Sequence, residues 1–289
     1  MTIPILYEDD ALLVINKPAG LVVNRAQSVK TETVQEWVED YLKIRNPKSE
    51  IRNKYNIQNI NVQNNFEFIQ RAGIVHRIDK ETSGILLIAK TPEAFIELQR
   101  QFKAREIKKT YLAIVHGKLV PEEGEINAPI DRLPWNPQRF GVMPGGKESV
   151  TRYKVSVVIP ATELASRSLR RSGPGSREKK GWIPGQARND MSLVELYPET
   201  GRTHQIRVHL KYINHSIVGD YLYAGRKTSR DDRAGDAPRV MLHAWKISFI
   251  HPGTRKLLAI ESPIPDDMMN IINSKSEARN PKQIPSTKF

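Results

Sequence analysis

The sequence predicts an α+β fold built on a mixed, mostly antiparallel central sheet with flanking helices. Two observations lead to this class. Apolar runs typical of strands and segments with helical spacing are mixed along the chain, and they do not follow the regular βαβ alternation of a doubly wound sheet. The chain also has 289 residues with a hydrophobic content of 39%, which is enough to bury a core of this kind.

The first elements lie before residue 50. Residues 11–16 form a short apolar run that stops at Pro18 and Gly20, so we expect a strand that enters a turn. Thr33 and Glu36 form a capping box at the start of a helix whose apolar residues recur at helical spacing. This helix is expected to end near Asn46-Pro47.

The remaining elements follow from the same patterns. Residues 84–90 predict a buried strand, and Thr91-Pro92 supplies an N-cap and a first-turn proline for the next helix. Strands are also expected at residues 111–116, 150–158, 191–197 and 240–250. A last helix should have Thr203 as its N-cap and bury Ile206, Leu210 and Ile213.

Three segments lie outside this pattern of elements. Residues 46–66 are polar and read as an irregular surface connection. Residues 161–190 are rich in Gly, Pro, Ser and Arg and fall between two strands, so they predict a surface insertion. We therefore expect one domain over residues 1–268 with this insertion, followed by a polar C-terminal tail over residues 269–289.

The composition limits the possible functions. The chain has no cysteine, which excludes disulfides, thiolate nucleophiles and Cys-ligated zinc. It contains no signal-peptide pattern and no run of about 18 apolar residues, so we expect a cytoplasmic protein without a membrane span. A net charge of +13 favours a polyanionic partner, first of all a nucleic acid. No surplus apolar stripe is visible, which favours a monomer.

The segment from His76 to Gly84 is the first candidate for chemistry. It reads HRIDKETSG and leads directly into the predicted strand at residues 84–90, which would place Asp79 in the preceding loop. The residues alone are also consistent with a polar turn in which Asp and Thr cap backbone groups.

Two further segments concentrate polar residues beside apolar ones. Lys109 to Gly117 places Tyr111 at the start of a strand, either as a core residue or as a ring on which a base stacks. Residues 196–210 contain GRTHQIRVHL, in which Arg207 would lie near the buried edge of a helix. A partly buried arginine needs an acidic partner, and Asp79 is a candidate because no acid follows Arg207 in this helix.

These three segments, in this order, resemble the motifs of the RluA-type family of RNA pseudouridine synthases. HRIDKETSGILLIAK resembles the family's catalytic motif, the run around Tyr111 its tyrosine motif, and GRTHQIRVHL its arginine motif. The resemblance extends over most of residues 5–268, with the best overall match to the RluC/RluD-like members that act on large-subunit ribosomal RNA. It implies the pseudouridine-synthase fold, with a catalytic cleft at the sheet.

The resemblance also implies roles for individual residues. Asp79 would be the nucleophile, Tyr111 would stack on the uracil and assist proton transfer, and Arg207 would pair with Asp79. Arg77 would fill the gap left by a uridine that is flipped out of its RNA stack. The remaining motif residues would lie around the substrate, and these are His76, Thr82, Arg202, His204 and Gln205. No cofactor is implied.

Some features depart from the family pattern or leave alternatives open. Ile78 and Glu81 stand where Leu and Asp are more frequent in the family, and the small N-terminal RNA-binding domain of many relatives is expected to be missing. A tRNA target and a non-catalytic RNA-binding role in ribosome assembly remain alternatives. His204 and His209 lie five residues apart, on different faces of one helix, and no H-E-x-x-H pair occurs, so we expect no metal site.

Overall fold

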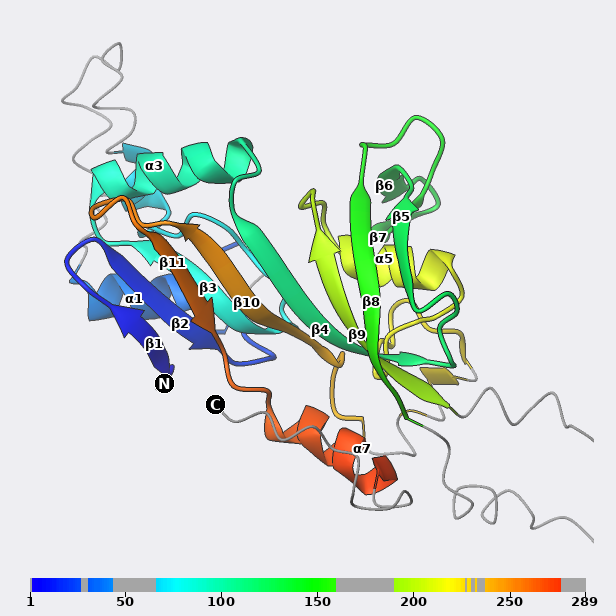
Figure 1. The fold of residues 1–289 in the computed structure, drawn as a ribbon. Helices are drawn as coiled ribbons and strands as arrows, with labels where there is room; N and C mark the ends of the chain where they lie inside the picture. Colours follow the sequence, from blue (N-terminus) through cyan, green and yellow to red (C-terminus); the bar gives the residue numbers. More distant parts are fainter. Residues whose placement is uncertain are drawn as a thin grey trace, which may run out of the picture.

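The computed structural model describes residues 2–26, 31–43, 66–159, 190–226, 228–229, 232 and 237–276. The predicted connection at residues 46–66, the predicted insertion at 161–190 and the predicted tail at 269–289 therefore lie wholly or largely outside the described residues. Within the described part, the prediction of an α+β fold with a mostly antiparallel sheet is confirmed (Figure 1).

The main sheet runs in the order β1-β2-β3-β10-β4-β9-β8-β5, and β11 pairs with β10. Only β3 and β10 are parallel among these neighbours. The strands are β1 (Ile5–Glu8), β2 (Leu12–Lys17), β3 (Ser83–Ala89), β4 (Lys108–His116), β5 (Glu123–Asn127), β8 (Val150–Ile159), β9 (Met191–Pro198), β10 (Leu242–Ile250) and β11 (Leu257–Glu261). A separate hairpin consists of β6 (Ile130–Leu133) and β7 (Asn136–Val142).

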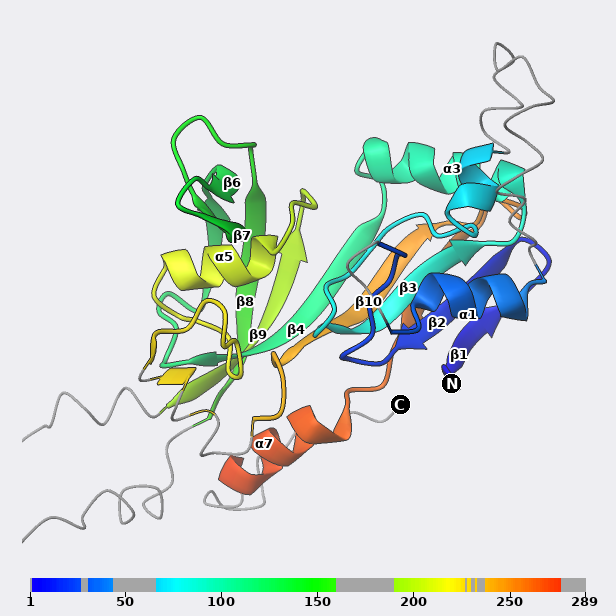
Figure 2. The ribbon, with the colours of Figure 1, turned by 180° about the vertical axis from the view of Figure 1, so that it is seen from behind.

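The helices cover the two halves of this sheet. Helix α1 (Val34–Tyr41) lies beside β2 and β3, and α5 (Gln205–Tyr212) lies on the same side of the sheet beside β8 and β9 (Figure 2). Helix α3 (Pro92–Lys103) packs against β3, and α7 (Asp266–Ser276) contacts β8. The region between α1 and α5 is where the loop before β3 meets the N-terminal end of α5.

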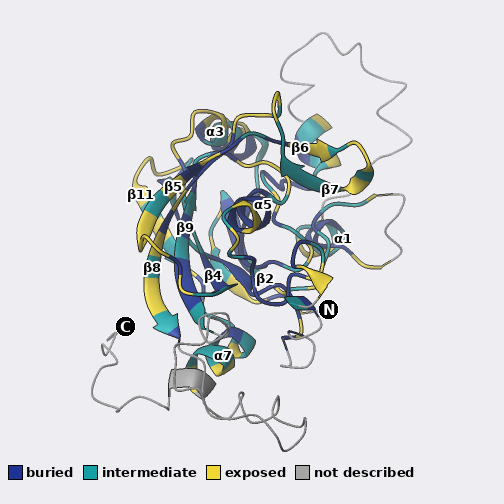
Figure 3. Ribbon diagram, turned by 90° about the vertical axis from the view of Figure 1, so that its right-hand side faces the viewer, coloured by how far each residue is buried: buried dark blue, intermediate teal, exposed yellow. Residues whose placement is uncertain are grey.

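Strand β3 is the most buried element of the sheet. Every residue from Ser83 to Ala89 is buried, because alternate side chains enter two different hydrophobic clusters on opposite faces. Figure 3 shows this contrast between buried inner strands and the exposed outer faces of β8 and β11. Gly84 has a φ of +111° and touches Ala244 so closely that a Cβ would collide with its carbonyl. The Ser83-Gly84 pair thus lets β3 and β10 approach each other directly after the Asp79 loop.

Three predicted element limits differ from the structure. Helix α1 has the predicted Thr33–Glu36 capping box, but it ends at Tyr41, and the positive φ of 53° at Lys43 takes the chain out of the helix before residue 46. The N-cap of α5 is His204 in a left-handed conformation, so the prediction of Thr203 is wrong. Helix α7 crosses residue 268, where the domain was expected to end, and it buries Met268 completely. None of the helices in the described ranges is long and apolar enough to span a membrane.

Candidate active site

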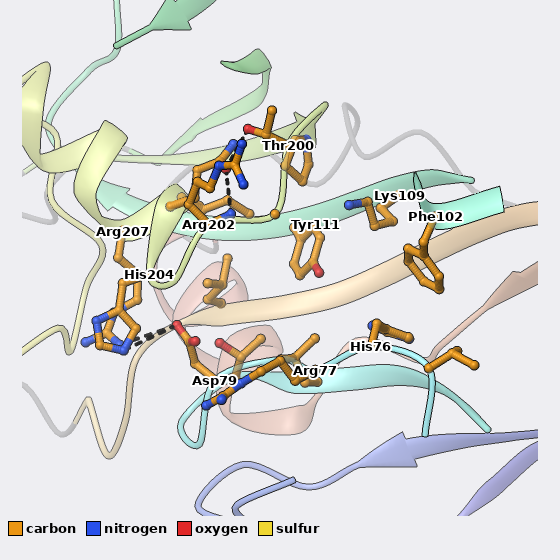
Figure 4. Close-up of a pocket in the computed structure, with 18 of the residues that line it drawn as sticks. His76, Arg77, Asp79, Phe102, Lys109, Tyr111, Thr200, Arg202, His204 and Arg207 are labelled. Atoms are coloured by element: carbon orange, nitrogen blue, oxygen red, sulfur yellow. Dashed lines mark hydrogen bonds and ion pairs between the residues drawn. The ribbon is translucent and has the colours of Figure 1, made fainter. Parts of the chain in front are cut away.

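A cavity of about 320 Å³ opens where the three motif segments meet. Its wall contains all nine residues that the sequence assigned to the site, from the loop before β3, from β4 and from the start of α5 (Figure 4). They come together because β10 inserts between β3 and β4, and β9, which leads into α5, pairs with the other edge of β4.

Asp79 occupies a loop whose backbone is fixed from two directions. Its own carbonyl accepts a hydrogen bond from the N–H of Thr82 at 3.1 Å, which closes a turn. The carbonyl of the neighbouring Lys80 accepts from the N–H of Gly20 at 2.8 Å. The Asp79 side chain remains 20% exposed, so its carboxylate faces the cavity while the loop itself is held rigidly.

Lys17 is a buried cation beneath this loop that the sequence analysis did not identify as a site residue. Its ammonium donates to the carbonyls of Pro18, Leu21 and Lys80 at 2.7, 2.9 and 3.0 Å. Burial lowers the pKa of Lys17 to about 7, against the opposing influence of the Glu81 and Asp79 carboxylates. The turn residues KPAG were visible in the sequence, but the connection to Lys80, 63 residues away, was not.

Arg207 has a different principal partner from the one expected. Its Nε and Nη2 donate to the two carboxylate oxygens of Asp220 at 2.8 and 2.9 Å, whereas its Nη1 lies 3.5 Å from Asp79 Oδ2. The last distance is at the limit of a hydrogen bond, and the first two form a bidentate pair. Burial alone would lower the pKa of Arg207, but the hydrogen bonds to Asp220 raise it. Asp220 therefore fixes Arg207, and Arg207 presents its remaining N–H groups to Asp79.

Asp220 is itself fully buried and held by the backbone. Its Oδ1 also accepts from the N–H groups of Leu222 and Tyr223 at 3.2 and 3.1 Å. The only sequence signal for this role was a single acid in a turn, 13 residues after Arg207. An acid outside the helix cannot be assigned to an arginine from local spacing alone.

His204 lies beside Asp79 and is held by Tyr223. Its Nδ1 is 2.8 Å from the Tyr223 hydroxyl, and its Nε2 is 4.0 Å from Asp79 Oδ2. The Phe140 N–H donates to that hydroxyl, and a hydroxyl that in turn donates its proton to Nδ1 would place the proton of a neutral ring on Nε2, toward Asp79. Burial lowers the pKa of His204, and the Arg207 charge adds to this effect although Asp79 opposes it.

Tyr111 faces the middle of the cavity from β4. Burial raises the pKa of its hydroxyl, and the negative charge of Asp79 raises it further, so Tyr111 stays protonated at neutral pH. Its ring lies between Asp79 and the far end of the cavity, as Figure 4 shows. A planar apolar surface at this place is suited to contact with a base.

The other predicted substrate-binding residues divide into two groups. Gln205 is buried, and its amide accepts from the Arg202 N–H and donates to the Val150 carbonyl, so this side chain is used within the protein. Thr82 is likewise buried. In contrast, Arg77 is exposed and Arg202 is exposed at the rim, where its Nε donates to the Glu148 carbonyl.

The family model for RNA pseudouridylate synthases matches residues 11–212 of this chain. This range contains Asp79, Tyr111 and Arg207 with their surrounding motifs. The chain belongs to this family. Among its relatives in the RNA pseudouridylate synthase family, the ribosomal large subunit pseudouridine synthase D of Nitrosomonas europaea is 37% identical over 93% of this chain. An uncharacterised RNA pseudouridine synthase of Bacillus subtilis is 34% identical over 92% of it.

The chain spans 64% of the length of the Nitrosomonas relative and 70% of the Bacillus one. The fold also matches that of human RNA pseudouridylate synthase domain containing 1, with a TM-score of 0.60 and 23% identity over 91% of this chain and 83% of the human one. In the part of the chain that the structure describes, no three His, Asp or Glu side chains are grouped as a metal site would require.

Proposed function

We propose that this protein converts uridine to pseudouridine in RNA and that Asp79 is its nucleophile. The observation that carries the proposal is the position of the Asp79 carboxylate. It faces a cavity of about 320 Å³, 3.5 Å from a buried arginine, and the Tyr111 ring lines the same cavity. This arrangement supplies a charged oxygen, a fixed cation and an aromatic surface in one place.

The isomerisation requires a nucleophile that can also leave. The bond between uracil N1 and ribose C1′ breaks, and a bond between C5 and C1′ forms. The C5 proton is lost, and one proton is gained at N1. Asp79 can serve by attacking C1′ and later leaving it, or by adding to C6 of the ring and later being eliminated. Both routes preserve the composition and oxidation level of the nucleoside, so neither uses a cofactor.

Arg207 and Tyr111 support this step in different ways. Arg207 is held in place by Asp220, and its Nη1 orients the Asp79 carboxylate. Tyr111 provides the stacking surface for the uracil, which contributes roughly 1–3 kcal/mol to binding.

The RNA substrate would approach along the rim that carries Arg77 and Arg202. Arg77 is exposed, lines the cavity, and has no ion-pair partner within the described residues. An unpaired cation beside the nucleophile can replace the flipped uridine in its stack. We propose large-subunit ribosomal RNA as the target, because the Nitrosomonas relative bears that name. A tRNA target is the alternative.

The proposal can be tested by the release of tritium from C5 of labelled uridine in transcribed ribosomal RNA. Wild-type protein should release tritium, and Asp79→Asn should release none above background. The same variant should bind RNA as tightly as wild type or slightly better, because a negative charge near the phosphates is removed. Glu81→Gln, which neutralises an acid in the same loop, serves as the matched control and should stay active.

Two results would contradict the proposal. Tritium release by pure Asp79→Asn would remove Asp79 as the nucleophile. Wild-type protein that binds RNA without releasing tritium from ribosomal RNA or tRNA would favour a non-catalytic RNA-binding role. Mapping of pseudouridines in ribosomal RNA and tRNA from cells with and without the gene would identify the target.

A further inference from the structure

The cavity has a second end that the proposed reaction does not use. Asp79, His204 and Arg207 surround one end, whereas His76, Phe102 and Lys109 line the other (Figure 4). Arg71, which also lines the cavity, is close enough to His76 for its charge to act on that ring. Tyr111 lies between the two ends. Lys109 and Tyr111 are two residues apart on β4, so their side chains leave the same face of the strand about 6–7 Å apart.

Lys109 brings a positive charge into this end. Its Nζ lies 6.0 Å from the centre of the Phe102 ring, and it forms no ion pair with any described residue. Burial lowers the pKa of Lys109 because the charge is poorly hydrated there. A cation in this situation is stabilised by an anion that enters the cavity.

His76 contributes a second donor next to Lys109. Its Nε2 accepts a hydrogen bond from the backbone N–H of Leu87 at 3.0 Å, which places the proton of the neutral ring on Nδ1. No described residue accepts from this Nδ1–H. The ring packs on Phe102 with centroids 4.9 Å apart, and burial together with the Lys109 charge lowers the pKa of His76 to about 3. His76 is therefore a neutral, fixed N–H donor at any physiological pH.

The chemistry of this end fits an anion better than a base. Lys109 and Arg71 are cations, His76 offers an N–H, and no carboxylate lines this half of the cavity among the described residues. Arg71 Nη1 already forms an ion pair with Glu67 Oε1 at 3.0 Å. Of these two cations, Lys109 is therefore the one available to a ligand. A base would need acceptor groups as well as donors, whereas phosphate oxygens only accept.

We propose that Lys109 and His76 bind a backbone phosphate adjacent to the target uridine while the uracil lies against Tyr111. This inference rests on the proposed function, since it takes RNA as the ligand of the same cavity. The subsite would fix the phosphate on one side of the flipped nucleotide, and the reacting carbon would then be positioned at Asp79 by a contact remote from the chemistry.

The test uses short RNAs that contain the mapped uridine and carry one methylphosphonate, which removes the charge of a single linkage. One RNA is modified on the 5′ side of the uridine and another on the 3′ side. For wild-type protein, one of the two should bind about tenfold more weakly than unmodified RNA. Lys109→Met should bind unmodified RNA about tenfold more weakly and should show no further loss with that methylphosphonate.

A neighbouring lysine provides the matched control. Lys108 is exposed and lies on the opposite face of β4, so Lys108→Met should keep the full methylphosphonate penalty. With transcribed ribosomal RNA, the logarithm of the binding constant should fall less steeply with the logarithm of the salt concentration for Lys109→Met than for wild type. The slope should be smaller in magnitude by about 0.7–0.9. In His76→Leu, the methylphosphonate penalty should shrink without disappearing, provided that thermal unfolding shows an intact fold.

The subsite is refuted if Lys109→Met still loses the full affinity with each methylphosphonate RNA. If His76→Leu shows the same loss of affinity as wild type, His76 is not part of the subsite. Failure of the proposed function gives a different result. In that case wild-type protein releases no tritium from any RNA and no target uridine can be mapped, while the salt dependence of ribosomal RNA binding can still be compared between wild type and Lys109→Met.

Discussion

Asp220 binds the Arg207 guanidinium through two hydrogen bonds of 2.8 and 2.9 Å, while Asp79 lies 3.5 Å from the same group. The guanidinium is thus bound closely by the Asp220 carboxylate and only weakly by the Asp79 carboxylate. Asp220, which is fully buried, fixes the position of Arg207, and Asp79, which is partly exposed, receives the weaker contact and stays free to react. A nucleophile held by a tighter pair would have to break that pair before each attack.

Replacing Asp220 by asparagine should therefore affect both stability and catalysis. The change leaves a buried arginine without its charge partner, so we expect a loss of about 3 kcal/mol in the free energy of unfolding. A displaced guanidinium should also lower the rate of tritium release by about a hundredfold with little change in RNA affinity. Urea denaturation and single-turnover kinetics would measure the two effects.

The Arg239–Asp267 pair offers a control for the Asp220 variant. It is also bidentate, with distances of 2.6 and 2.7 Å, but Asp267 lies on α7 outside the cavity. Asp267→Asn should lower stability and leave the rate nearly unchanged. An Asp220→Asn protein with the rate of wild type would show that Asp79 alone positions Arg207.

Arg77 should matter most where the RNA has to be unstacked. Arg77→Ala should slow modification of a structured RNA at least about tenfold more than modification of an unstructured strand, because the wedge is needed only when a stack must be replaced. Lys80→Ala removes another exposed cation of the same loop and should affect both RNAs equally. Equal losses on both RNAs in Arg77→Ala would mean that Arg77 is a phosphate contact.

Acidification should destabilise the protein partly through His76. Burial lowers the pKa of this residue in the folded state to about 3, compared with 6.5 for an exposed histidine. Below pH 6.5 the unfolded chain binds a proton that the folded protein does not, so stability is present above this pH and is lost as the pH falls toward 3. The loss due to His76 is at most about 1.4 kcal/mol per pH unit.

The contribution of His76 can be separated from those of other groups. Between pH 6.5 and 5 most carboxylates are still ionised in the unfolded chain. In this range, the free energy of unfolding of His76→Leu should depend less steeply on pH than that of wild type. Parallel curves for the two proteins would contradict the assignment of a His76 that stays neutral in the folded protein.

The segment between β8 and β9 should be replaceable by a short turn. Ile159, the last residue of β8, pairs directly with Met191, the first residue of β9, so the ends of the segment are already adjacent. A variant in which residues 161–189 are replaced by a two-residue hairpin turn should fold and release tritium at a rate within about threefold of wild type. A variant that fails to fold would show that part of the segment packs into the core.

The sequence by itself predicted three of the helices, the strands β2, β3, β4, β8, β9 and β10, and the loop that carries Asp79, but it did not predict β1, β5, β6, β7, β11 or α7. Period-2 and period-3.6 patterns, the Thr33 and Thr91 caps and the apolar run of β3 are local features, and local features fix which segments form helices and strands. The three motifs also placed Asp79, Tyr111 and Arg207 together, since a family pattern records which segments meet. The cavity contains all three.

Only the tertiary structure decided how the charges in the site are shared. Three relationships depend on contacts between different segments of the chain: Asp220 as the partner of Arg207, Lys17 beneath the Lys80 carbonyl, and Lys109 beside His76. Among the described residues, Lys109 has no ion-pair partner. The left-handed conformation of His204 was also not predictable from the sequence, because no side chain caps the helix there. The turn is held instead by the hydrogen bond between Arg202 and Gln205 and by the contact between His204 and Tyr223. Ion pairs and hydrogen bonds depend on distances of a few tenths of an ångström, and those distances are set by how β3, β4, β10 and α5 pack together.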